Sequence, residues 1–196
     1  MGVGSASAMA QVPATACGVR RWPVKVMLDD DTGRVAKTPV AGTIAELGRV
    51  ARPDGDLLQR GRAAPHEVTI YRVLAVVRQM STQADGDWHL VLADPDAPHA
   101  TMIGEVPDSA CALGSPFAGV YNAVRRRLRG ISRGAIVEVT GVGFFDHPHG
   151  QHGAAPNNFE LHPVIGIAPV AVRRDSGGAA APPPAGPARS LPRLRQ

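Results

Sequence analysis

Hydrophobic and polar positions alternate along much of the chain with a period of two, which is the pattern of β-strands in a sheet. Five short strands are predicted, over residues 67–77, 87–94, 100–107, 135–146 and 159–167. In the first strand β-branched residues dominate, and one face carries four apolar residues, Val68, Ile70, Leu74 and Val76. In the second strand one face carries Trp88, Leu90 and Leu92, and the other His89, Val91 and Ala93.

One helix is predicted between the third and fourth strands, over residues 115–128. Ser115 stands where a side chain can cap free backbone N–H groups, and Pro116 suits the first helical position. The apolar residues repeat at spacings of three and four: Phe117, Val120, Tyr121, Val124 and Leu128. We interpret the arginines of the other face as a solvated surface in preference to a phosphate site: Arg125, Arg126, Arg127 and Arg129.

The order strand, strand, strand, helix, strand, strand is that of the OB-fold. We therefore expect an all-β protein, an OB-fold-like five-stranded Greek-key β-barrel over residues 67–168 with its helix between strands 3 and 4. Residues 17–66 are expected to form an N-terminal extension. It contains a short helix over residues 43–50, because Thr43 and Glu46 have the spacing of a capping box.

The net charge of +4 comes entirely from the C-terminal end of the 196-residue chain. Of the 21 basic and 17 acidic side chains, five and one respectively lie in residues 173–196, so the remaining residues carry 16 of each. A formally neutral body has no bulk electrostatic attraction for polyphosphate. Nucleic-acid binding is therefore not favoured, and the eight aromatic residues are few for a base-stacking surface.

Both ends of the chain differ in composition from the predicted barrel. Residues 1–16 are expected to be a flexible N-terminus or the remnant of a signal peptide, because only the small-residue end of such a signal is present. Residues 169–196 are rich in Pro, Ala and Arg and are expected to be a disordered tail. No membrane span is expected, because no run approaches the roughly 18–20 apolar residues that one needs.

The densest group of polar side chains lies in and after the loop of residues 147–158. Three histidines of this loop, His147, His149 and His152, follow Asp146. Glu160 and His162 are two apart on the fifth strand and therefore project to the same face. A zinc or other divalent metal site could form from His89, His149, Glu160 and His162. In the alternative interpretation, which we favour because no strong metal-binding motif occurs, these groups hydrogen-bond the loop to the barrel.

The two cysteines, Cys17 and Cys111, leave two alternatives open. They could be free buried thiols in a cytosolic protein or one disulfide in an exported protein. A disulfide would close a loop of about 95 residues, which the chain-entropy relation values at roughly 4–5 kcal/mol. It would also join the N-terminal extension to the barrel near the third strand.

Five segments resemble those of an uncharacterised family of mostly exported bacterial proteins: ACGVRRWPVK, TIAEL, DWHLVLAD, TMIGEVPDSAC and VTGVGFFDHPHGQHGAAPNNFELHPV. Its members carry CG-x-x-RW-x-VK near the start and HGQ-x-G-x-APN-x-x-ELHPV near the end, and the likeness covers residues 16–167. The resemblance implies an OB-like fold, export and a disulfide between Cys17 and Cys111. By position it places candidate binding residues at His89, Asp146, His149, Gln151, Asn157, Glu160 and His162. This chain departs from the pattern at Trp88, His147 and His152.

Three functions are compatible with these residues. The first, which we favour, is a non-enzymatic exported binding or structural module of unknown ligand or protein partner, with His89, Glu160, His162 and the 147–158 loop as its contact surface. The second is a metal-dependent hydrolase acting on phosphodiesters, with His89, His149 and His162 as ligands and Glu160 as ligand or general base. The third is single-stranded nucleic-acid binding. Export would place the protein in the periplasm or outside the cell; a chain without a leader would stay in the cytoplasm.

Overall fold

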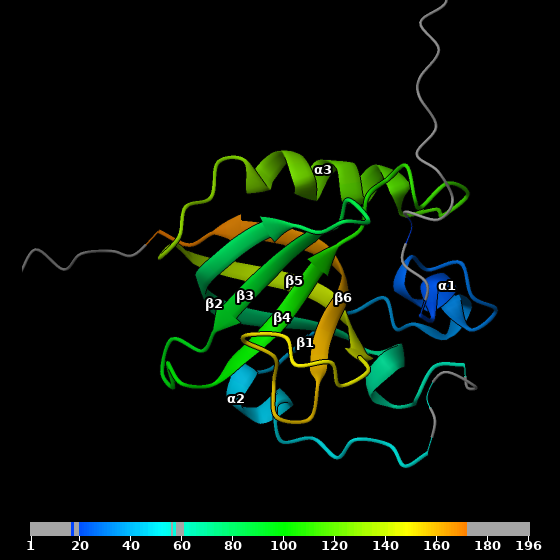
Figure 1. Cartoon of the computed structure of the whole chain (residues 1–196), viewed down its shortest axis with the longest axis horizontal. Helices are drawn as coiled ribbons and strands as arrows, with labels where there is room; N and C mark the ends of the chain where they lie inside the picture. Colours follow the sequence, from blue (N-terminus) through cyan, green and yellow to red (C-terminus); the bar gives the residue numbers. More distant parts are fainter. Residues whose placement is uncertain (1–16, 18–19, 56, 58–60, 172–196) are drawn as a thin grey trace, which may run out of the picture.

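Five strands form a closed barrel in the computed structural model, which describes residues 17, 20–55, 57 and 61–171 (Figure 1). The strands are β2 (Ile70–Thr82), β3 (Trp88–Ala93), β4 (Thr101–Val106), β5 (Ile136–Phe145) and β6 (Phe159–Pro169). They pair in the order β2-β3-β4-β6-β5, and β2 also pairs with β5, which closes the barrel. Only β4 and β6 pair in parallel within this barrel. The predicted order of elements and the OB-fold-like class are thereby confirmed.

The barrel interior is filled by alternate residues of each strand. In β2 the buried residues are the odd-numbered set, Tyr71, Val73, Ala75 and Val77. The apolar face predicted from the even-numbered residues is the outer one, and Leu74 there is 45% exposed. Both faces of this strand are apolar, so a period of two alone does not tell which face is inside. Ile70, at the start of that outer face, is covered by Met27 of the extension.

Helix α3 (Ala118–Leu128) lies across one end of the barrel, between β4 and β5 in the sequence (Figure 1). Its buried side chains are Tyr121, Val124 and Leu128, which belong to the predicted apolar stripe. The predicted start was three residues too early. Ser115 does not cap the helix, because its Oγ accepts a hydrogen bond from the Phe117 N–H (3.1 Å) in the preceding turn.

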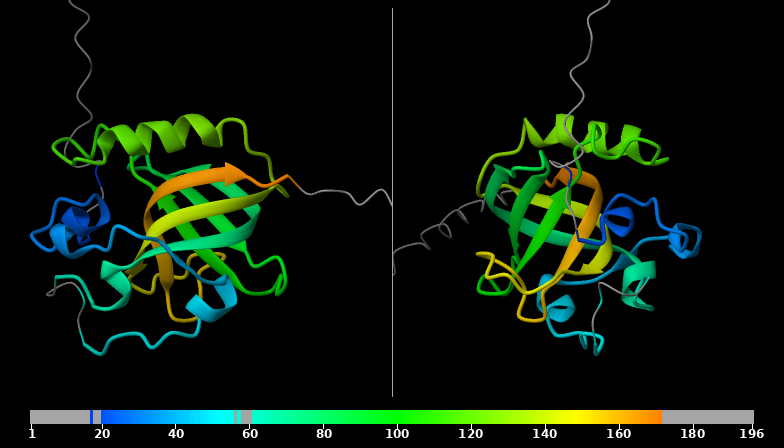
Figure 2. Two further views of the ribbon diagram at one scale, coloured as in Figure 1. Left: turned by 180° about the vertical axis from the view of Figure 1, so that it is seen from behind. Right: turned by 45° about the vertical axis from the view of Figure 1, so that its right-hand side comes forward.

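The N-terminal extension contributes short elements that lie on the outside of the barrel (Figure 2). They are α1 (Trp22–Lys25), η2 (Thr32–Arg34), β1 (Val40–Ala41), α2 (Ile44–Leu47) and η4 (His66–Val68). The capping box of Thr43 and Glu46 is confirmed at the start of α2. The sequence did not predict α1, which lies beside β6, whereas α2 lies at the end of the barrel opposite α3 (Figure 1). Strand β1 pairs in parallel with the start of β2.

Two arginine–carboxylate pairs fix the extension: Arg62–Asp29 joins two of its own segments, and Arg21–Glu67 joins it to the barrel at Phe145. The Arg62 guanidinium donates to both oxygens of Asp29 (3.0 and 2.6 Å) and to the backbone oxygens of Val24 and Glu67. Arg21 donates to both oxygens of the fully buried Glu67 (2.8 and 2.5 Å), which also accepts from the Phe145 N–H. Such charge-assisted bidentate pairs fix geometry as well as energy. None of the helices described is long and apolar enough to cross a membrane.

Candidate functional site

A cluster of ionisable side chains covers the outer face of β3, β4 and β6. His89 stands directly opposite Glu105 in the β3–β4 register, and the neighbouring β6 supplies Glu160 and His162. Each points outward from the barrel because the residues next to it in the sequence, Leu90, Val106 and Leu161, belong to the barrel core. All four are nevertheless buried, with exposures of 7%, 7%, 2% and 0% respectively. We refer to these four, with Lys25, Asp87 and Asp146, as the charged cluster.

Glu105 lies at the centre of this cluster. Its Oε1 is 2.9 Å from Nδ1 of His89, and its Oε2 is 3.0 Å from Nδ1 of His162. Oε1 of Glu160 lies 3.3 Å from the same His162 nitrogen. One carboxylate therefore holds two imidazoles from two neighbouring strands.

Helix α1 and the start of the 147–158 loop cover the cluster from outside. Nζ of Lys25 lies 3.5 Å from Oδ1 of Asp146 and 4.0 Å from Oε2 of Glu105. The same ammonium group is 5.2 Å from the centre of the Phe144 ring, at a distance typical of a cation–π contact. His149, which is exposed, places Nδ1 3.3 Å from Oδ2 of Asp146. Lys25 thus supplies the cation between carboxylates of two separate segments.

At its inner end the cluster contains two buried polar atoms without a hydrogen-bond partner among the described residues, Nε2 of His162 and Oδ2 of Asp87. They are 3.9 Å apart. The other Asp87 oxygen accepts from the Asp108 N–H at 2.8 Å. With Glu105, these two residues bring one ligand-type atom each within 4.8 Å of one another.

Burial and pairing shift the pKa values of the cluster in opposite directions. Burial alone would lower the pKa of His162, but hydrogen bonds to Glu105 and Glu160 outweigh it and raise this pKa to about 9. Burial alone would raise the pKa of Glu105, but hydrogen bonds from both imidazoles hold it well below its ordinary value. Burial raises the pKa of Asp87 to about 7 and that of Glu160 to about 6. His162 is therefore an imidazolium at neutral pH.

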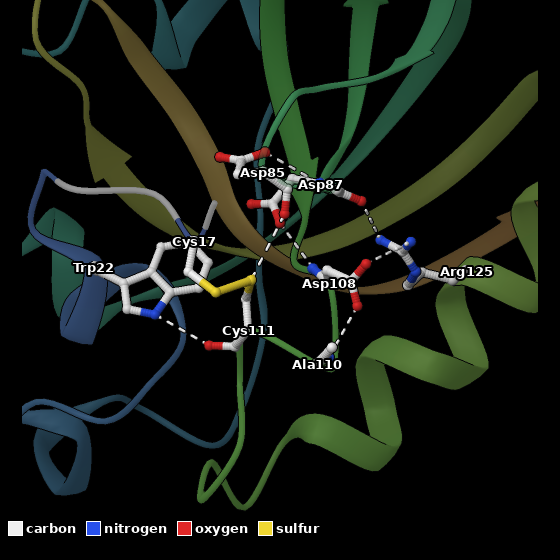
Figure 3. The surroundings of a disulfide bond; sticks show 9 residues. Cys17, Trp22, Asp85, Asp87, Asp108, Ala110, Cys111 and Arg125 are labelled. Carbon is white, nitrogen blue, oxygen red and sulfur yellow. Dashed lines mark hydrogen bonds and ion pairs between the residues drawn. A yellow bond between two sulfur atoms is a disulfide. The ribbon is translucent and has the colours of Figure 1, made fainter. Parts of the chain in front are cut away.

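The cysteines form a disulfide beside this cluster (Figure 3). Cys17 of the extension is bonded to Cys111 in the loop between β4 and α3, which confirms the disulfide alternative. Nε1 of Trp22, the first residue of α1, donates to the Cys111 backbone oxygen at 3.1 Å. Figure 3 shows Asp87 close to this bridge. The disulfide therefore holds α1, the cover of the charged cluster, on the barrel.

The structure distributes the predicted site residues over two places. The charged cluster contains His89, Asp146, Glu160 and His162, and His149 lies at its edge. Asn157 lies elsewhere: its Nδ2 donates to the backbone oxygens of Leu47 and Val50 (2.9 Å each) and joins the loop to the α2 region. Gln151 is half-buried within the same loop.

Sequence reasoning missed three members of the cluster, Lys25, Asp87 and Glu105. The sequence did contain a signal for Glu105, which is a single carboxylate inside the apolar run of residues 100–107. It stands two residues from Ile103 and directly before Val106, so it lies within the predicted strand. Lys25 carries no periodicity signal, because its position depends on a disulfide and on α1; its one sequence signal was its place at the end of the CG-x-x-RW-x-VK motif.

A second polar region, open to solvent, is a groove of about 730 Å³ over β2 and β3. Its charged and imidazole side chains are Arg78, His99, Arg133 and His152, all of them exposed. Gln79, Met80, Val91, Thr101 and Gly153 complete its lining, so no carboxylate of the described residues lines it. We refer to it as the cationic groove.

Comparisons with known proteins leave the function open. No protein-family model and no curated protein matches this sequence. The fold is similar to part of a crystal structure assigned as an aspartyl-tRNA synthetase from Leishmania major Friedlin, at 14% identity and a TM-score of 0.42. That match covers 69% of this chain and 21% of the other. At this level of similarity the assignment to an OB-like barrel rests on the strand order and closure described above.

Proposed function

We propose that the protein is an exported, non-enzymatic binding module in which the charged cluster is part of the architecture. One observation carries this proposal: the cluster lies beneath α1, and its central carboxylate, Glu105, is occupied by two imidazoles. A general acid, a general base or a metal-bound nucleophile must reach its substrate. His89, Glu105, Glu160 and His162 are 0–7% exposed and bonded to one another, so they serve better to hold α1 and the 147–158 loop in place than as the contact surface expected from the sequence.

Export is supported by the disulfide between Cys17 and Cys111. Disulfides persist in oxidising compartments and are rare in the cytosol. This one joins segments 94 residues apart in the sequence, and the cover of the charged cluster depends on it. We infer that the protein functions in the periplasm or outside the cell.

The metal-dependent hydrolase finds less support in the same geometry. Of its four predicted ligands, His89 and His162 both present Nδ1 to Glu105, whereas His149 contacts Asp146 on the far side of Lys25. Single-stranded nucleic-acid binding is also less supported, because the lining of the cationic groove includes no Trp, Tyr or Phe on which bases could stack.

The experiment that tests this proposal is a hydrolysis assay on the oxidised full-length chain. The probe is bis(p-nitrophenyl) phosphate, with Zn²⁺, Mn²⁺ or Mg²⁺ added in turn. We expect nitrophenolate release no faster than in buffer with the metal alone. Hydrolysis above that rate that is lost in both His162→Gln and Asp87→Asn, with circular dichroism showing both variants folded, would overturn the non-enzymatic proposal.

A further inference from the structure

The first wall of the cationic groove carries two arginines from adjacent segments. Arg78 lies at an irregularity of β2, where Val77 pairs with Leu92 and Gln79 already pairs with Val91. Such a bulge leaves one residue outside the ladder and redirects its side chain. Arg133 comes from the α3–β5 loop, which is fixed beside it because the Gly134 N–H donates to the Val77 oxygen at 2.7 Å.

The second wall carries two histidines. His99 stands in the loop between β3 and β4, and His152 in the 147–158 loop. The position of His152 is set by Gly153, because a Cβ added there would overlap the Val91 side chain. The loop therefore lies directly on β3 at Val91, a buried residue of the groove lining.

The separation of the two walls indicates the size of the ligand. Arg78 belongs to β2, whereas β4, which begins two residues after His99 at Thr101, is two strands away across β3. Neighbouring strands are about 4.8 Å apart, so the strands at the two walls are about 10 Å apart. An extended ligand with a negative group at each end matches this spacing, and a single small anion would contact one wall only.

The remaining lining narrows the chemistry of that ligand. Gln79 and Thr101 offer hydrogen-bonding side chains between the walls, which suits the hydroxyl groups of a sugar, while the missing aromatic rings disfavour a nucleobase. Arginine recognises phosphate and sulfate oxygens through paired N–H donors. Among the described residues no carboxylate is in the lining, so none of them neutralises Arg78 and Arg133 there.

We propose that the cationic groove binds a saccharide-like ligand that carries two phosphate or sulfate groups, one contacting Arg78 and Arg133 and the other contacting the imidazoles of His99 and His152. This inference rests on the proposed binding function and gives it a ligand class. Phosphate and sulfate esters share the tetrahedral oxyanion that the two walls recognise, and the experiment below separates them.

The test is calorimetry together with amide NMR on the oxidised full-length chain. The probes are fructose 1,6-bisphosphate, a disulfated heparin disaccharide, and fructose 6-phosphate as the comparison with a single ester group. We expect one of the two probes with two ester groups to bind at least tenfold more tightly than fructose 6-phosphate, and to shift the amide signals of Val91 and Thr101. Which of them binds more tightly identifies the phosphate or the sulfate source.

Matched double variants locate the binding. Arg78→Ala with Arg133→Ala should weaken binding tenfold or more, whereas Arg126→Ala with Arg127→Ala removes the same charge from exposed positions on α3 and should leave it unchanged. Three results would overturn the inference. They are an equal loss of binding in both variants, tighter binding of an oligothymidylate at the same amides, and no saturable binding at millimolar concentration of either probe with two ester groups. Binding that maps to another surface would overturn the proposed site in the groove but not the proposed binding function. Hydrolysis that depends on His162 would overturn the proposed non-enzymatic function but not ligand binding in the groove.

Discussion

The charged cluster and the cationic groove lie on the same barrel exterior, yet they treat charge differently. In the covered cluster carboxylates face cations, as Glu105 does with His162 and Asp146 with Lys25. In the open groove, no carboxylate of the described residues lines the surface around Arg78 and Arg133. An unpaired charge is costly when buried and cheap in water. Buried charges therefore need oppositely charged partners, whereas the exposed, unbalanced charge of the groove can bind a negatively charged ligand.

The 147–158 loop connects the two regions. It is preceded by Asp146, which binds Lys25 in the cluster, and its His152 and Gly153 form a wall of the groove. Asn157 joins the loop to the backbone near α2. Different residues of this segment serve the two regions. A substitution can therefore change the cluster or the groove separately, and each of the following experiments is designed to do so.

Removing the disulfide should have the largest effect. Cys17→Ser with Cys111→Ser opens a loop of 94 residues and should lower the free energy of unfolding by about 4–5 kcal/mol. Urea titration measures it, with reduction of the wild-type chain as an independent route to the same loss. Under conditions where exchange occurs by local opening, hydrogen exchange should increase over α1, which covers the cluster, more than at Val91 in the groove. An equal increase by local opening at Val91 would show that the two regions are not independent.

Loss of the central carboxylate should have the next largest effect. Glu105→Gln leaves two imidazoles with a neutral partner in a buried place, which should cost about 3–5 kcal/mol of unfolding free energy. Glu138→Gln is the matched control, because Glu138 is half exposed and 3.9 Å from Arg72, where a pair contributes about 1 kcal/mol or less. Similar losses in the two variants, measured by urea titration, would contradict a special role for the buried carboxylate.

Stability should fall as the pH rises from about 6 to 9. The raised pKa of His162, about 9, means that its contribution is complete below its unfolded value of about 6.5 and is lost as the pH passes through 9, an effect of about 3 kcal/mol. The raised pKa values of Asp87 and Glu160 act in the same direction at lower pH, because the folded chain holds their protons. The lowered pKa of Glu105 opposes them only in acid.

These charges face His162 from every side, since Lys25 comes from α1, Glu105 from β4, Glu160 from β6 itself, and Asp87 from the residue before β3. Asp87→Asn should remove part of the loss between about pH 4 and 7 and leave the loss between 6.5 and 9. His99→Gln, in the groove, is the control and should leave the profile unchanged. Melting temperatures across this range measure the effect, and a flat profile in the wild-type chain would contradict a charged His162.

The sequence predicted the barrel better than it predicted the site. Strand and helix positions follow from local periodicity, as in α3, where Tyr121, Val124 and Leu128 are buried as their spacing indicates. The capping box at Thr43 is equally local and is present. Which face of β2 is interior depends on its pairing with β5, so periodicity alone did not determine it.

The charged cluster depends on contacts between segments that are far apart in the sequence. Glu160 and His162 could be paired because they are two residues apart on one strand. Lys25 reaches Asp146 across more than a hundred residues through an extension that a disulfide holds in place, and Asp87 meets His162 only after the barrel closes. The excess positive charge of the groove was not visible in the sequence, because the total charge of residues 1–172 is formally zero. That total adds the paired charges of the cluster to the unpaired arginines of the groove.

The smallest expected effect comes from a single methyl group on the loop that the two regions share. Gly153 and Gly150 both have a positive φ, of 83° and 73°, so alanine costs about 1–2 kcal/mol at either position. Only at Gly153 does the added Cβ overlap Val91; nothing lies within 4 Å of it at Gly150. Gly153→Ala should therefore displace the loop from β3 and lower the free energy of unfolding by about 1 kcal/mol more than Gly150→Ala does.

Displacing the loop also moves His152, so we expect Gly153→Ala to weaken binding of the probe with two ester groups several-fold. Gly150→Ala has the same backbone strain and should leave binding unchanged. The fall in stability between pH 6 and 9 should be the same in both variants, since neither glycine touches the charged cluster. Calorimetric titration and thermal melts measure the two quantities. Equal binding by the two variants would show that the loop does not form the second wall, and the ligand would then be held by Arg78 and Arg133 alone.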